Sequence, residues 1–488
     1  MVRLFLYSED KMKDLSRKIF STTVGKVCLG IFVFNILLCL YNLFKISHYF
    51  SIGIIGGLVF ILILLFLLLF VCTLHYPKVS VGMNIVLCVL LIVSSLMVNR
   101  ISTFSSHITN TKEIEVIEIV VSKDSQFNES SDLSGKVLAS YIEDDDGLEK
   151  ARIILDDHHK EGVQEKRYDD MKKAYQDVLD GKVDMLVFSP LSTSLIEEEL
   201  ENENKTRVLF SKEFEINNLI KTSHKDISKE PFVMYLGGVD LSSNGKVSGS
   251  GRGDVNILLV VNPITKKTLL QVVPRDLYSY NPVKKKRSKL SWSGKWGGVQ
   301  SSIYSIEHEL GIKIDYYAKI TFDGFKDLID SIGGIDVYSH YTFNSNQWGG
   351  FYHYDKGYNH LDGEAALRFA RSRKMLPEND ISRGIHQTEV IKAIFKKVSE
   401  NPTYSYLNAT LEAIEQNFMT SLPEDQFDDA FYLFMNMQDA FVNIDTYTME
   451  GKIKWHDDEI IGGYYYFYLN DGEIEKVRNR INDVLLDK

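Results

Sequence analysis

The sequence of 488 residues predicts an α/β protein that begins with a membrane segment of three helices. Three apolar runs occupy the first hundred residues, and strand-like and helix-like patterns alternate through the rest of the chain. We expect three regions: a cytoplasmic tail with three transmembrane helices over residues 1–100, a linker with a small α/β accessory domain over 101–225, and a larger α/β domain over 226–488. The last region is expected to have a central mixed sheet flanked by helices.

The membrane segment is predicted from the runs Val24–Phe44, Ile52–Leu74 and Val81–Val98. Each is close to the roughly 20 residues that a helix needs to cross the hydrocarbon core. A cleavable signal peptide is not expected, because the first run is too long and no small-residue cleavage site follows it.

Basic residues near the spans predict the orientation. The N-terminal tail carries five of them, whereas the two connections carry only Lys45 and Lys78. The N-terminus should therefore be cytoplasmic, and three spans place everything after Asn99 outside. If Val81–Val98 does not span, the orientation reverses.

The accessory domain is predicted from alternating elements after the polar linker 101–112. We expect strands over 113–122, 136–142, 184–190 and 207–216, with amphipathic helices over 149–159 and 167–179. No catalytic constellation is visible in this region.

The larger domain is predicted to contain buried strands over Pro231–Asp240, Val255–Val261 and Thr268–Val273. The loop Asn262–Lys267 joins the last two as a hairpin. Helices are expected over 300–310, 322–332 and 383–398.

Composition excludes several classes of function. The formal net charge of −11 argues against nucleic acid as a partner, because phosphate backbones need a basic face. The four cysteines all lie within the first hundred residues. The region after Asn99 therefore holds no disulfide, no Cys-ligated zinc and no thiol nucleophile.

Charged residues gather at the open end of the predicted hairpin. A turn centred between Ile264 and Thr265 sets Arg275 opposite Asp254 and Asp276 opposite Gly253, within one or two residues. Arg252 belongs to the same end, and Asp240, which closes the preceding strand, can reach it. A surface salt-bridge cluster at a sheet edge is the alternative interpretation.

A second group of polar residues follows a short helix. Asp362–Ala370 is predicted as a helix with Asp362 near its N-terminus, and Arg371 and Arg373 follow it. In an extended segment their spacing of two places both guanidinium groups on one face. Arg383 and Gln387 lie on an apolar helix stripe, where polar groups are costly unless they meet a partner. They either close a salt-bridge network or face a ligand.

Arginines beside paired carboxylates suit a phosphate ligand. Guanidinium groups bind phosphate oxygens in bidentate fashion, and Mg²⁺ uses one or two carboxylates together with substrate phosphates. A pyrophosphate on a lipid carrier would satisfy the arginines, the acids and the membrane anchor together.

At these residues the chain resembles the LytR–CpsA–Psr family of cell-wall glycopolymer transferases. The matching stretches are GRGDVNILLVVNPITKKTLLQVVPRDLY, GIKIDYYAKITFDGFKDLIDSIGGIDV and GYNHLDGEAALRFARSRK with DISRGIHQTEV. They cover roughly residues 231–398, with a weaker tail to about 486. The three-span anchor and the accessory domain further resemble the capsule-assembly branch, the Wzg/CpsA-type proteins. The chain departs from the common Arg-Ser-Asp of the family at Arg252-Gly253-Asp254.

The resemblance implies a LytR–CpsA–Psr phosphotransferase domain over residues 226–488. Such an enzyme takes a glycopolymer, capsular or other, from polyprenyl (undecaprenyl) pyrophosphate and attaches it to peptidoglycan on the outer face of a bacterial cell membrane. It implies Mg²⁺, with Mn²⁺ as the alternative, on Asp240 and Asp254. The pyrophosphate-binding residues implied are Arg252, Arg275, Arg371, Arg373, Arg383 and Gln387, and the catalytic residues are Arg275, Asp276 and Arg371. The polyprenyl chain is implied to lie in an apolar tunnel, for which the helix 322–332 offers candidate lining residues.

Two other functions remain open on the sequence. The protein is alternatively a non-catalytic lipid-binding regulator or assembly subunit that contacts capsule export membrane proteins, or a pyrophosphatase that uses the same site. The basic run Lys284–Lys289 beside Trp292 and Trp296 is either a solvated loop or a contact with anionic lipid or glycan.

Overall fold

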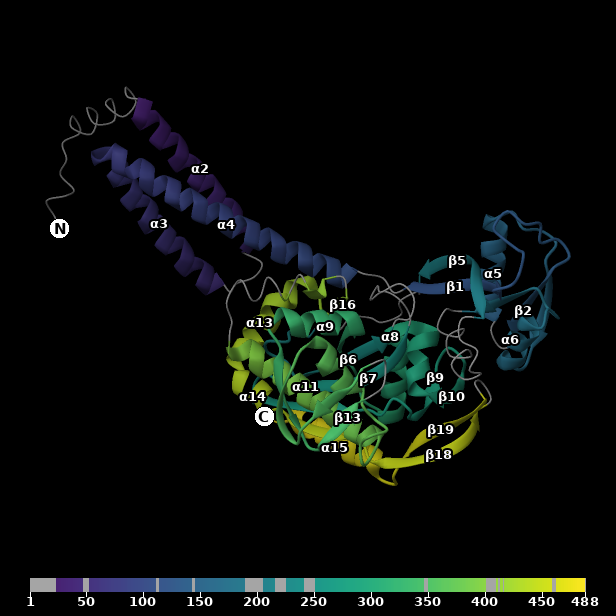
Figure 1. The fold of residues 1–488 in the computed structure, drawn as a ribbon. Helices are drawn as coiled ribbons and strands as arrows, with labels where there is room; N and C mark the ends of the chain where they lie inside the picture. Colours follow the sequence, from purple (N-terminus) through teal and green to yellow (C-terminus); the bar gives the residue numbers. More distant parts are fainter. Residues whose placement is uncertain are drawn as a thin grey trace. The chain divides into compact units, whose positions relative to one another are not determined.

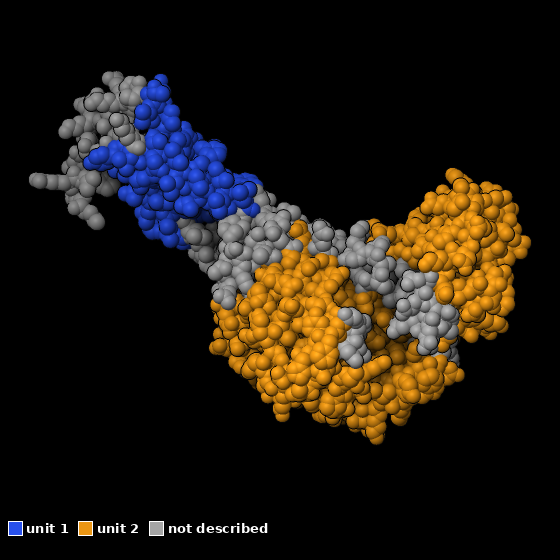
Figure 2. Space-filling model, in the orientation of Figure 1, with its two compact units in different colours: residues 1–107, 424–429 blue, residues 108–423, 430–488 orange. Residues whose placement is uncertain are grey.

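The protein is described from a computed structural model. The structure describes residues 23–46, 52–110, 114–142, 145–188, 205–215, 225–240, 251–345, 350–400, 410, 413–415, 417–458 and 462–487. The chain divides into two compact units, residues 1–107 with 424–429 and residues 108–423 with 430–488 (Figure 2).

Among the described residues before 111, the chain forms the helices α2 (Thr23–Ile46), α3 (Ile52–His75) and α4 (Pro77–Asn110). By length and composition, Thr23–Phe44 and Val79–Leu96 are long and apolar enough to cross a membrane. Within the described residues the apolar stretch of α3, Val59–Cys72, is shorter than these two. The structure thus supports two candidate spans, and three spans remain a prediction.

Polar side chains join α2 to α4. The Nδ2 of Asn35 donates to the backbone oxygen of Asn84 at 2.9 Å, and the Nδ2 of Asn42 donates to that of Leu91 at 3.0 Å. Both donors lie seven residues apart on α2, as do both acceptors on α4, so one helix face meets the other in register.

The accessory region forms a five-stranded sheet of order β3-β2-β4-β1-β5 (Figure 1). Its elements are β1 (Ile114–Ser122), β2 (Val137–Tyr141), α5 (Asp145–Asp157), β3 (Gln164–Tyr168), α6 (Met171–Leu179), β4 (Met185–Phe188) and β5 (Thr206–Glu215). The predicted elements are present, but β3 was not expected. Its sequence QEKRY lies at the sheet edge with four exposed residues and therefore shows no apolar alternation.

The larger α/β region has a six-stranded sheet of order β16-β11-β6-β7-β8-β17. The strands are β6 (Phe232–Asp240), β7 (Arg252–Asn262), β8 (Lys267–Val272), β11 (Tyr316–Thr321), β16 (Phe418–Thr420) and β17 (Asp445–Thr448). β6 is parallel to β11 and antiparallel to β7, so the predicted mixed sheet is confirmed. In the β7–β8 hairpin, Ile257 lies opposite Val272 and Val261 opposite Thr268, which is the predicted register.

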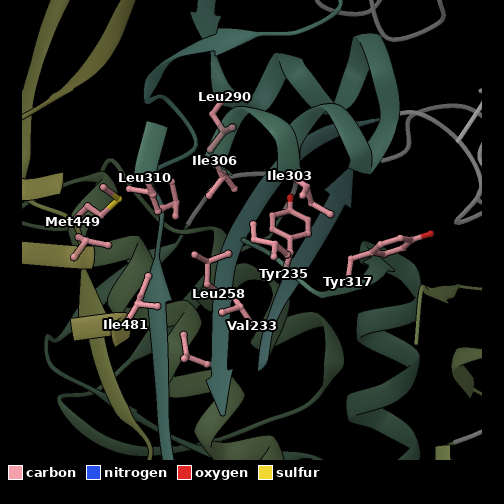
Figure 3. Packing of buried hydrophobic residues seen from close by; sticks show 14 of the residues in the cluster. Val233, Tyr235, Leu258, Leu290, Ile303, Ile306, Leu310, Tyr317, Met449 and Ile481 are labelled. Atoms are coloured by element: carbon pink, nitrogen blue, oxygen red, sulfur yellow. The ribbon is translucent and has the colours of Figure 1, made fainter. Parts of the chain in front are cut away.

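The two faces of this sheet have different partners. On one face Val233, Tyr235 and Leu258 pack against the helices α8 (Leu290–Leu310) and α15 (Glu473–Leu485), as Figure 3 shows. The alternate residues Met234 and Leu236 point to the opposite face and line a cavity.

A helical layer bounds this cavity. It comprises α9 (Phe322–Ser331), α10 (Gly363–Arg371) and α11 (Asp380–Glu400), which share a second apolar core with the two-stranded sheet of β12 (Ile335–Ser339) and β15 (Gly357–Leu361). The remaining elements are β9 (Tyr278–Asn281), β10 (Lys286–Lys289), β13 (Phe343–Ser345), β14 (Tyr352–Tyr354), η2 (Glu424–Gln426), α13 (Phe427–Asn436), α14 (Gln438–Val442), β18 (Gly451–Asp458) and β19 (Gly462–Leu469).

Two predicted boundaries are wrong. Residues 101–110, expected as part of a polar linker, form the C-terminal end of α4. The helix expected over 300–310 begins at Leu290, ten residues earlier. Gly297 and Gly298 have non-helical backbone angles that kink α8, and this break hides the helical period of its first half.

Candidate active site

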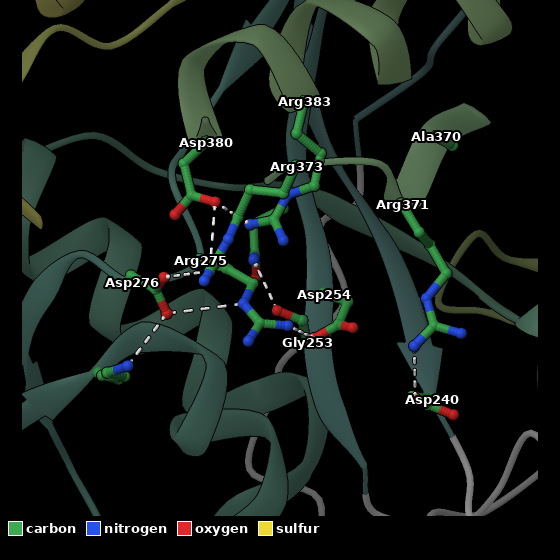
Figure 4. A network of polar contacts seen from close by, with 12 residues as sticks. Asp240, Gly253, Asp254, Arg275, Asp276, Ala370, Arg371, Arg373, Asp380 and Arg383 are labelled. Carbon is green, nitrogen blue, oxygen red and sulfur yellow. Dashed lines mark hydrogen bonds and ion pairs between the residues drawn. The ribbon is translucent and has the colours of Figure 1, made fainter. Parts of the chain in front are cut away.

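The ends of β6, β7 and β8 bring the predicted acids and arginines together (Figure 4). Asp240 lies opposite Arg252 in the β6–β7 ladder. One turn past β8, the Nη1 of Arg275 contacts the Oδ1 of Asp254, and its Nε lies 3.5 Å from the Oδ1 of Asp276. These five residues form one buried or half-buried cluster and not a salt-bridge fringe at the surface.

The next two arginines lie at the end of helix α10 and just after it. Asp362 caps its N-terminus by accepting a hydrogen bond from the backbone NH of Ala365 at 2.8 Å. Arg371 ends the helix, and its Nη2 lies 3.0 Å from the Oδ2 of Asp240. Its guanidinium group also lies 4.2 Å from the centre of the Phe322 ring.

Arg373 contacts a different carboxylate from the one that Arg371 contacts. Its Nη1 lies 3.3 Å from the Oδ2 of Asp276. The expectation that the two guanidinium groups share one extended face is therefore only partly met: both line the same cavity, but they contact different carboxylates. Arg371 is still helical, and the backbone becomes extended at Ser372.

Helix α11 supplies Arg383 and Gln387, which are both buried. Arg383 pairs through its Nη2 with the Oδ1 of Asp380 at 2.8 Å. The Nε2 of Gln387 donates to the backbone oxygen of Ala370 at 3.4 Å. Arg383 and Gln387 also line the cavity. Both of the predicted alternatives therefore apply: the two side chains bind neighbouring groups, and they also face a space that a ligand could fill.

Two members of the cluster were not found from the sequence. The Asp380 side chain is 1% exposed and also lies 3.6 Å from the Nη1 of Arg373. Its spacing of three from Arg383 on one helix was the available signal. Lys289, from the basic run, places its Nζ 3.4 Å from the Oδ1 of Asp276. Only the turn from β10 into α8 brings it there, so no sequence pattern identified it.

The surrounding charges set the pKa values of the acids. Burial raises the pKa of the Asp254 carboxyl, but Arg275, Arg252 and Arg383 lower it by more, so it lies below its ordinary value. The same balance of burial against Arg275 and Lys289 holds the pKa of Asp276 below its ordinary value. Asp254 and Asp276 are therefore ionised at neutral pH.

Asp240 and Asp380 behave in the opposite way. Burial raises the pKa of each, and the attraction of Arg371 for Asp240 and of Arg383 for Asp380 offsets only part of that rise. The cluster therefore contains two firmly ionised carboxylates and two whose charge is costly.

Cations outnumber carboxylates in the cluster. Its members are the arginines 252, 275, 371, 373 and 383 with Lys289, against the aspartates 240, 254, 276 and 380. Within the part of the chain that the structure describes, the buried Nε of Arg252 has no hydrogen-bond partner. An anion with several oxygens would balance the charge and satisfy that donor.

The arginines lie at one end of a cavity of about 820 Å³. Away from them its wall is apolar, with Met234, Leu236, Ala318, Ile320, Phe322, Phe325, Leu328, Leu367, Val390, Ile391, Ile394 and Phe395 among the lining residues. Three of the α9 residues expected as candidate lining thus face the cavity, whereas Ile329 and Ile332 pack in the core. The site can accept a ligand with an anionic head and a long apolar tail.

Asp240 and Asp254 are the two carboxylates that could hold a divalent cation. They lie near enough to repel each other, because the charge of Asp254 contributes to the raised pKa of Asp240. Among the described residues no group of three or more His, Cys, Asp or Glu side chains could hold a metal ion. Two carboxylates suit Mg²⁺, which completes its coordination with water and substrate phosphates.

The chain is similar to proteins of known family. Residues 187–483 match the LytR_cpsA_psr family. The polyisoprenyl-teichoic acid–peptidoglycan teichoic acid transferase TagU of Bacillus mycoides is 32% identical over 256 residues, which are 52% of this chain and 79% of that protein. TagU of Bacillus licheniformis is 31% identical over 256 residues, or 52% and 78% of the two chains.

Among solved structures, the protein gbs0355 of Streptococcus agalactiae is 26% identical, with a TM-score of 0.48, over 55% of this chain and 92% of that one. The family match covers more than half of the sequence and includes every residue of the arginine cluster. The chain belongs to the LytR–CpsA–Psr family.

Proposed function

We propose that the protein is a membrane-anchored phosphotransferase that moves a glycopolymer from a polyprenyl-pyrophosphate carrier to peptidoglycan. The observation that supports it is the cluster of five arginines at the end of an apolar cavity of about 820 Å³. The named relatives transfer teichoic acid from a polyisoprenyl carrier to peptidoglycan, which is the same class of reaction.

In the proposed complex the pyrophosphate lies among the arginines and the polyprenyl chain fills the apolar cavity. An acceptor hydroxyl oxygen attacks the glycan-side phosphorus and forms a new P–O bond. The bond from that phosphorus to the polyprenyl phosphate breaks, and the polyprenyl phosphate leaves with the electron pair. The hydroxyl proton is released to solvent, since such a transfer depends on position and charge more than on a base.

The arginines act mainly on the charge that develops in this step. Arg275, Arg371 and Arg373 come from two separate segments of the chain and surround the space above Asp254 (Figure 4). Each is held in place by a carboxylate before the substrate arrives, so little reorganisation is needed.

We propose Mg²⁺, or Mn²⁺ in its place, as the cofactor, held by Asp240 and Asp254. When bound, the ion would neutralise negative charge on the phosphates. Asp276 does not suit proton transfer, because Arg275 and Lys289 lie beside it and hold its pKa low.

The proposed location is a bacterial cell membrane, with a cytoplasmic N-terminus, three spans and the arginine cluster on the outer side. The accessory region supports the capsule-assembly branch of the family as the origin of the glycopolymer, and three spans, if present, would agree with it. Contact with export membrane proteins is part of the same proposal.

The test is Arg371→Ala in the full-length protein. Arg371 pairs with a partly exposed acid, so its loss should change the free energy of unfolding by only about 1 kcal/mol. Transfer of a lipid-linked glycan to peptidoglycan should fall by roughly a hundredfold or more, as for removal of one transition-state donor.

Product analysis separates the three functions. Wall-linked glycan with released polyprenyl phosphate indicates transfer, free glycan phosphate indicates a pyrophosphatase, and lipid binding without turnover indicates a non-catalytic subunit. Normal transfer by Arg371→Ala would refute the proposed site.

A further inference from the structure

Two buried carboxyl groups lie behind the arginines of the cluster. Among the residues described, Asp276 and Asp380 do not line the cavity, whereas Arg373 and Arg383 do. The acids belong to the segment after β8 and to the first residue of α11, and their side chains are 9% and 1% exposed. A ligand in the cavity would therefore meet the arginines and not the acids.

A single guanidinium nitrogen contacts both acids, as Figure 4 shows. The Nη1 of Arg373 lies 3.3 Å from the Oδ2 of Asp276 and 3.6 Å from the Oδ1 of Asp380. The Arg373 side chain is 35% exposed, so it has room to turn toward the cavity. An anion there would compete with both acids for the same guanidinium group.

Asp276 has further cations beside it. Its Oδ1 lies 3.5 Å from the Nε of Arg275 and 3.4 Å from the Nζ of Lys289. Lys289 does not line the cavity among the residues described, so a ligand would leave that contact in place. Asp276 therefore stays ionised even when Arg373 turns away from it.

Asp380 depends on cations that a ligand would engage. Its Oδ1 lies 2.8 Å from the Nη2 of Arg383, and in the part of the chain that the structure describes its only other ion pair is with Arg373. Both of these arginines line the cavity. When they turn their charge to an anion, a buried carboxylate remains beside the ionised Asp276, and its burial is then costly.

A proton on Asp380 would remove that cost. Neither of its oxygens accepts a hydrogen bond from a described residue, and neither does the Oδ1 of Asp276. Burial raises the pKa of Asp380, Arg383 offsets part of this rise, and the charge of Asp276 and a hydrogen bond between the two carboxyl groups raise it again. A protonated Asp380 would donate that hydrogen bond, and an anion bound nearby raises the pKa of the acid further.

We propose that Asp380 is a positioning residue that holds Arg373 and Arg383 in the ligand-free protein and takes up a solvent proton when the pyrophosphate binds. The proton forms an O–H bond on the carboxylate, and both guanidinium groups then turn their charge to the phosphates. Asp276 remains ionised and accepts the hydrogen bond from Asp380. This inference rests on the proposed transfer function, and it concerns the binding of the pyrophosphate and not the chemical step.

The direction of the pH effect follows from linkage between protons and ligand. The complex holds more protons than the free protein, so affinity for the pyrophosphate rises as the pH falls. Uptake of one proton changes the binding constant by at most about tenfold per pH unit. A residue with a purely structural role would produce no such dependence.

The experiment counts the protons that are taken up on binding. Full-length protein in nanodiscs is titrated at pH 6 and pH 7 with geranyl-pyrophosphoryl glucose, whose two substituted phosphates do not titrate near neutral pH. Calorimetry in buffers with different ionisation enthalpies gives the number of protons. Excess Mg²⁺ is present throughout, so that a metal-bound Asp240 does not titrate, and His386 on α11 stays neutral because its pKa is about 4.

The wild type should take up roughly half a proton or more at pH 6 and bind the probe severalfold more weakly at pH 7. Asp380→Asn imitates the protonated acid, because the amide is neutral and still donates to Asp276. We expect this variant to show no proton uptake, equal affinity at both pH values, and binding at pH 7 at least as tight as that of the wild type. Asp380→Ala removes the donor as well and should bind severalfold more weakly than Asp380→Asn.

Asp315 provides a matched control in the same α/β region. Its side chain is 4% exposed and pairs with the Nζ of Lys225 at 2.8 Å, so its burial and its ion pair resemble those of Asp380. Asp315 does not line the cavity among the residues described. Asp315→Asn should show the proton uptake and the pH dependence of the wild type.

Other outcomes would overturn the assignment. Binding without proton uptake by the wild type refutes the role of Asp380 and leaves the proposed function intact. Uptake that persists in Asp380→Asn assigns the proton to another group and refutes the role as well. The proton count of the wild type decides the matter even where a variant does not fold. No binding of the probe by the wild type would refute the proposed function and this inference with it.

Discussion

The charged residues of the cluster are buried or half-buried, and each carboxylate lies beside a cation that offsets its burial. Asp276 is 6% exposed and lies near cations from three segments, Arg275, Lys289 and Arg373. A buried carboxylate needs such partners, because its desolvation costs several kcal/mol otherwise. The same partners keep Asp276 ionised, and Asp276 in turn holds the guanidinium groups of Arg275 and Arg373 in place.

His386 allows a test at the residue scale. It is fully buried, its ring stacks on Phe369 with centres 4.0 Å apart, and burial lowers its pKa to about 4 from an ordinary 6.5. Between these two values the unfolded chain binds a proton that the folded protein does not. Stability should therefore fall as the pH decreases from 6.5 to 4, by about 2 kcal/mol between pH 7 and pH 5.

The measurement compares thermal unfolding of the wild type and His386→Phe in detergent at the two pH values. The phenylalanine variant should lack this part of the pH dependence, although it loses the contact between Nδ1 and the Phe369 oxygen. Equal pH dependence in both proteins would show that His386 has the same pKa in the folded and unfolded states, and would contradict the prediction.

At the scale of elements, the side chains of strand β11 alternate between the main apolar core and the cavity. Tyr317 packs toward α8, whereas Ala318 and Ile320 face the cavity. The helices α9 and α11 close the other side with Phe325, Leu328 and Val390. The cavity is therefore a gap between a sheet and a helical layer, and its size depends on the side chains that the layers present.

Ala318→Trp tests what this gap holds. The indole would occupy part of the cavity without touching the arginines, so a bound polyprenyl chain should be excluded. We expect the lipid extracted from the purified variant and detected by mass spectrometry to fall at least several-fold relative to the wild type and to Ala318→Ser. An overpacked core costs about 1–3 kcal/mol, so an unchanged thermal midpoint would show that the space was open. Equal lipid content in all three proteins would refute the lipid-binding cavity.

For the whole molecule, the membrane topology decides whether the proposed function is possible. Asn84 interrupts the third apolar run, yet its side chain and backbone meet Asn35 of the first run. Polar contacts of this kind join helices in an apolar environment, where an unpaired amide is costly. The pairing favours a common environment for α2 and α4, in line with three spans.

We expect a reporter enzyme that is active only outside the membrane to be active when fused after Asn99 or after Lys488. The same fusions should be inactive when residues 77–98 are deleted, because the number of spans then becomes even. Activity of both forms would contradict the predicted orientation and place the arginine cluster on a different side of the membrane from the one proposed.

Much of this protein follows from local patterns in the chain. The strands around the cluster are continuous apolar runs, the hairpin loop sets their register, and Asp254 and Arg275 meet where that register places them. Helix α10 begins at the predicted cap, Asp362. These features depend on residues close in sequence, so spacing and periodicity are enough to find them.

Other features depend on contacts between distant segments, which no local pattern encodes. Lys289 reaches Asp276 only because β10 turns into α8, and the edge strand β3 exists only because β2 offers it a partner. Sequence alone determined the mixed α/β sheet, the apolar N-terminal runs and most of the arginine cluster. The tertiary structure decided which acid each arginine contacts and the shape of the cavity beside them, because these arise from the packing of separate elements.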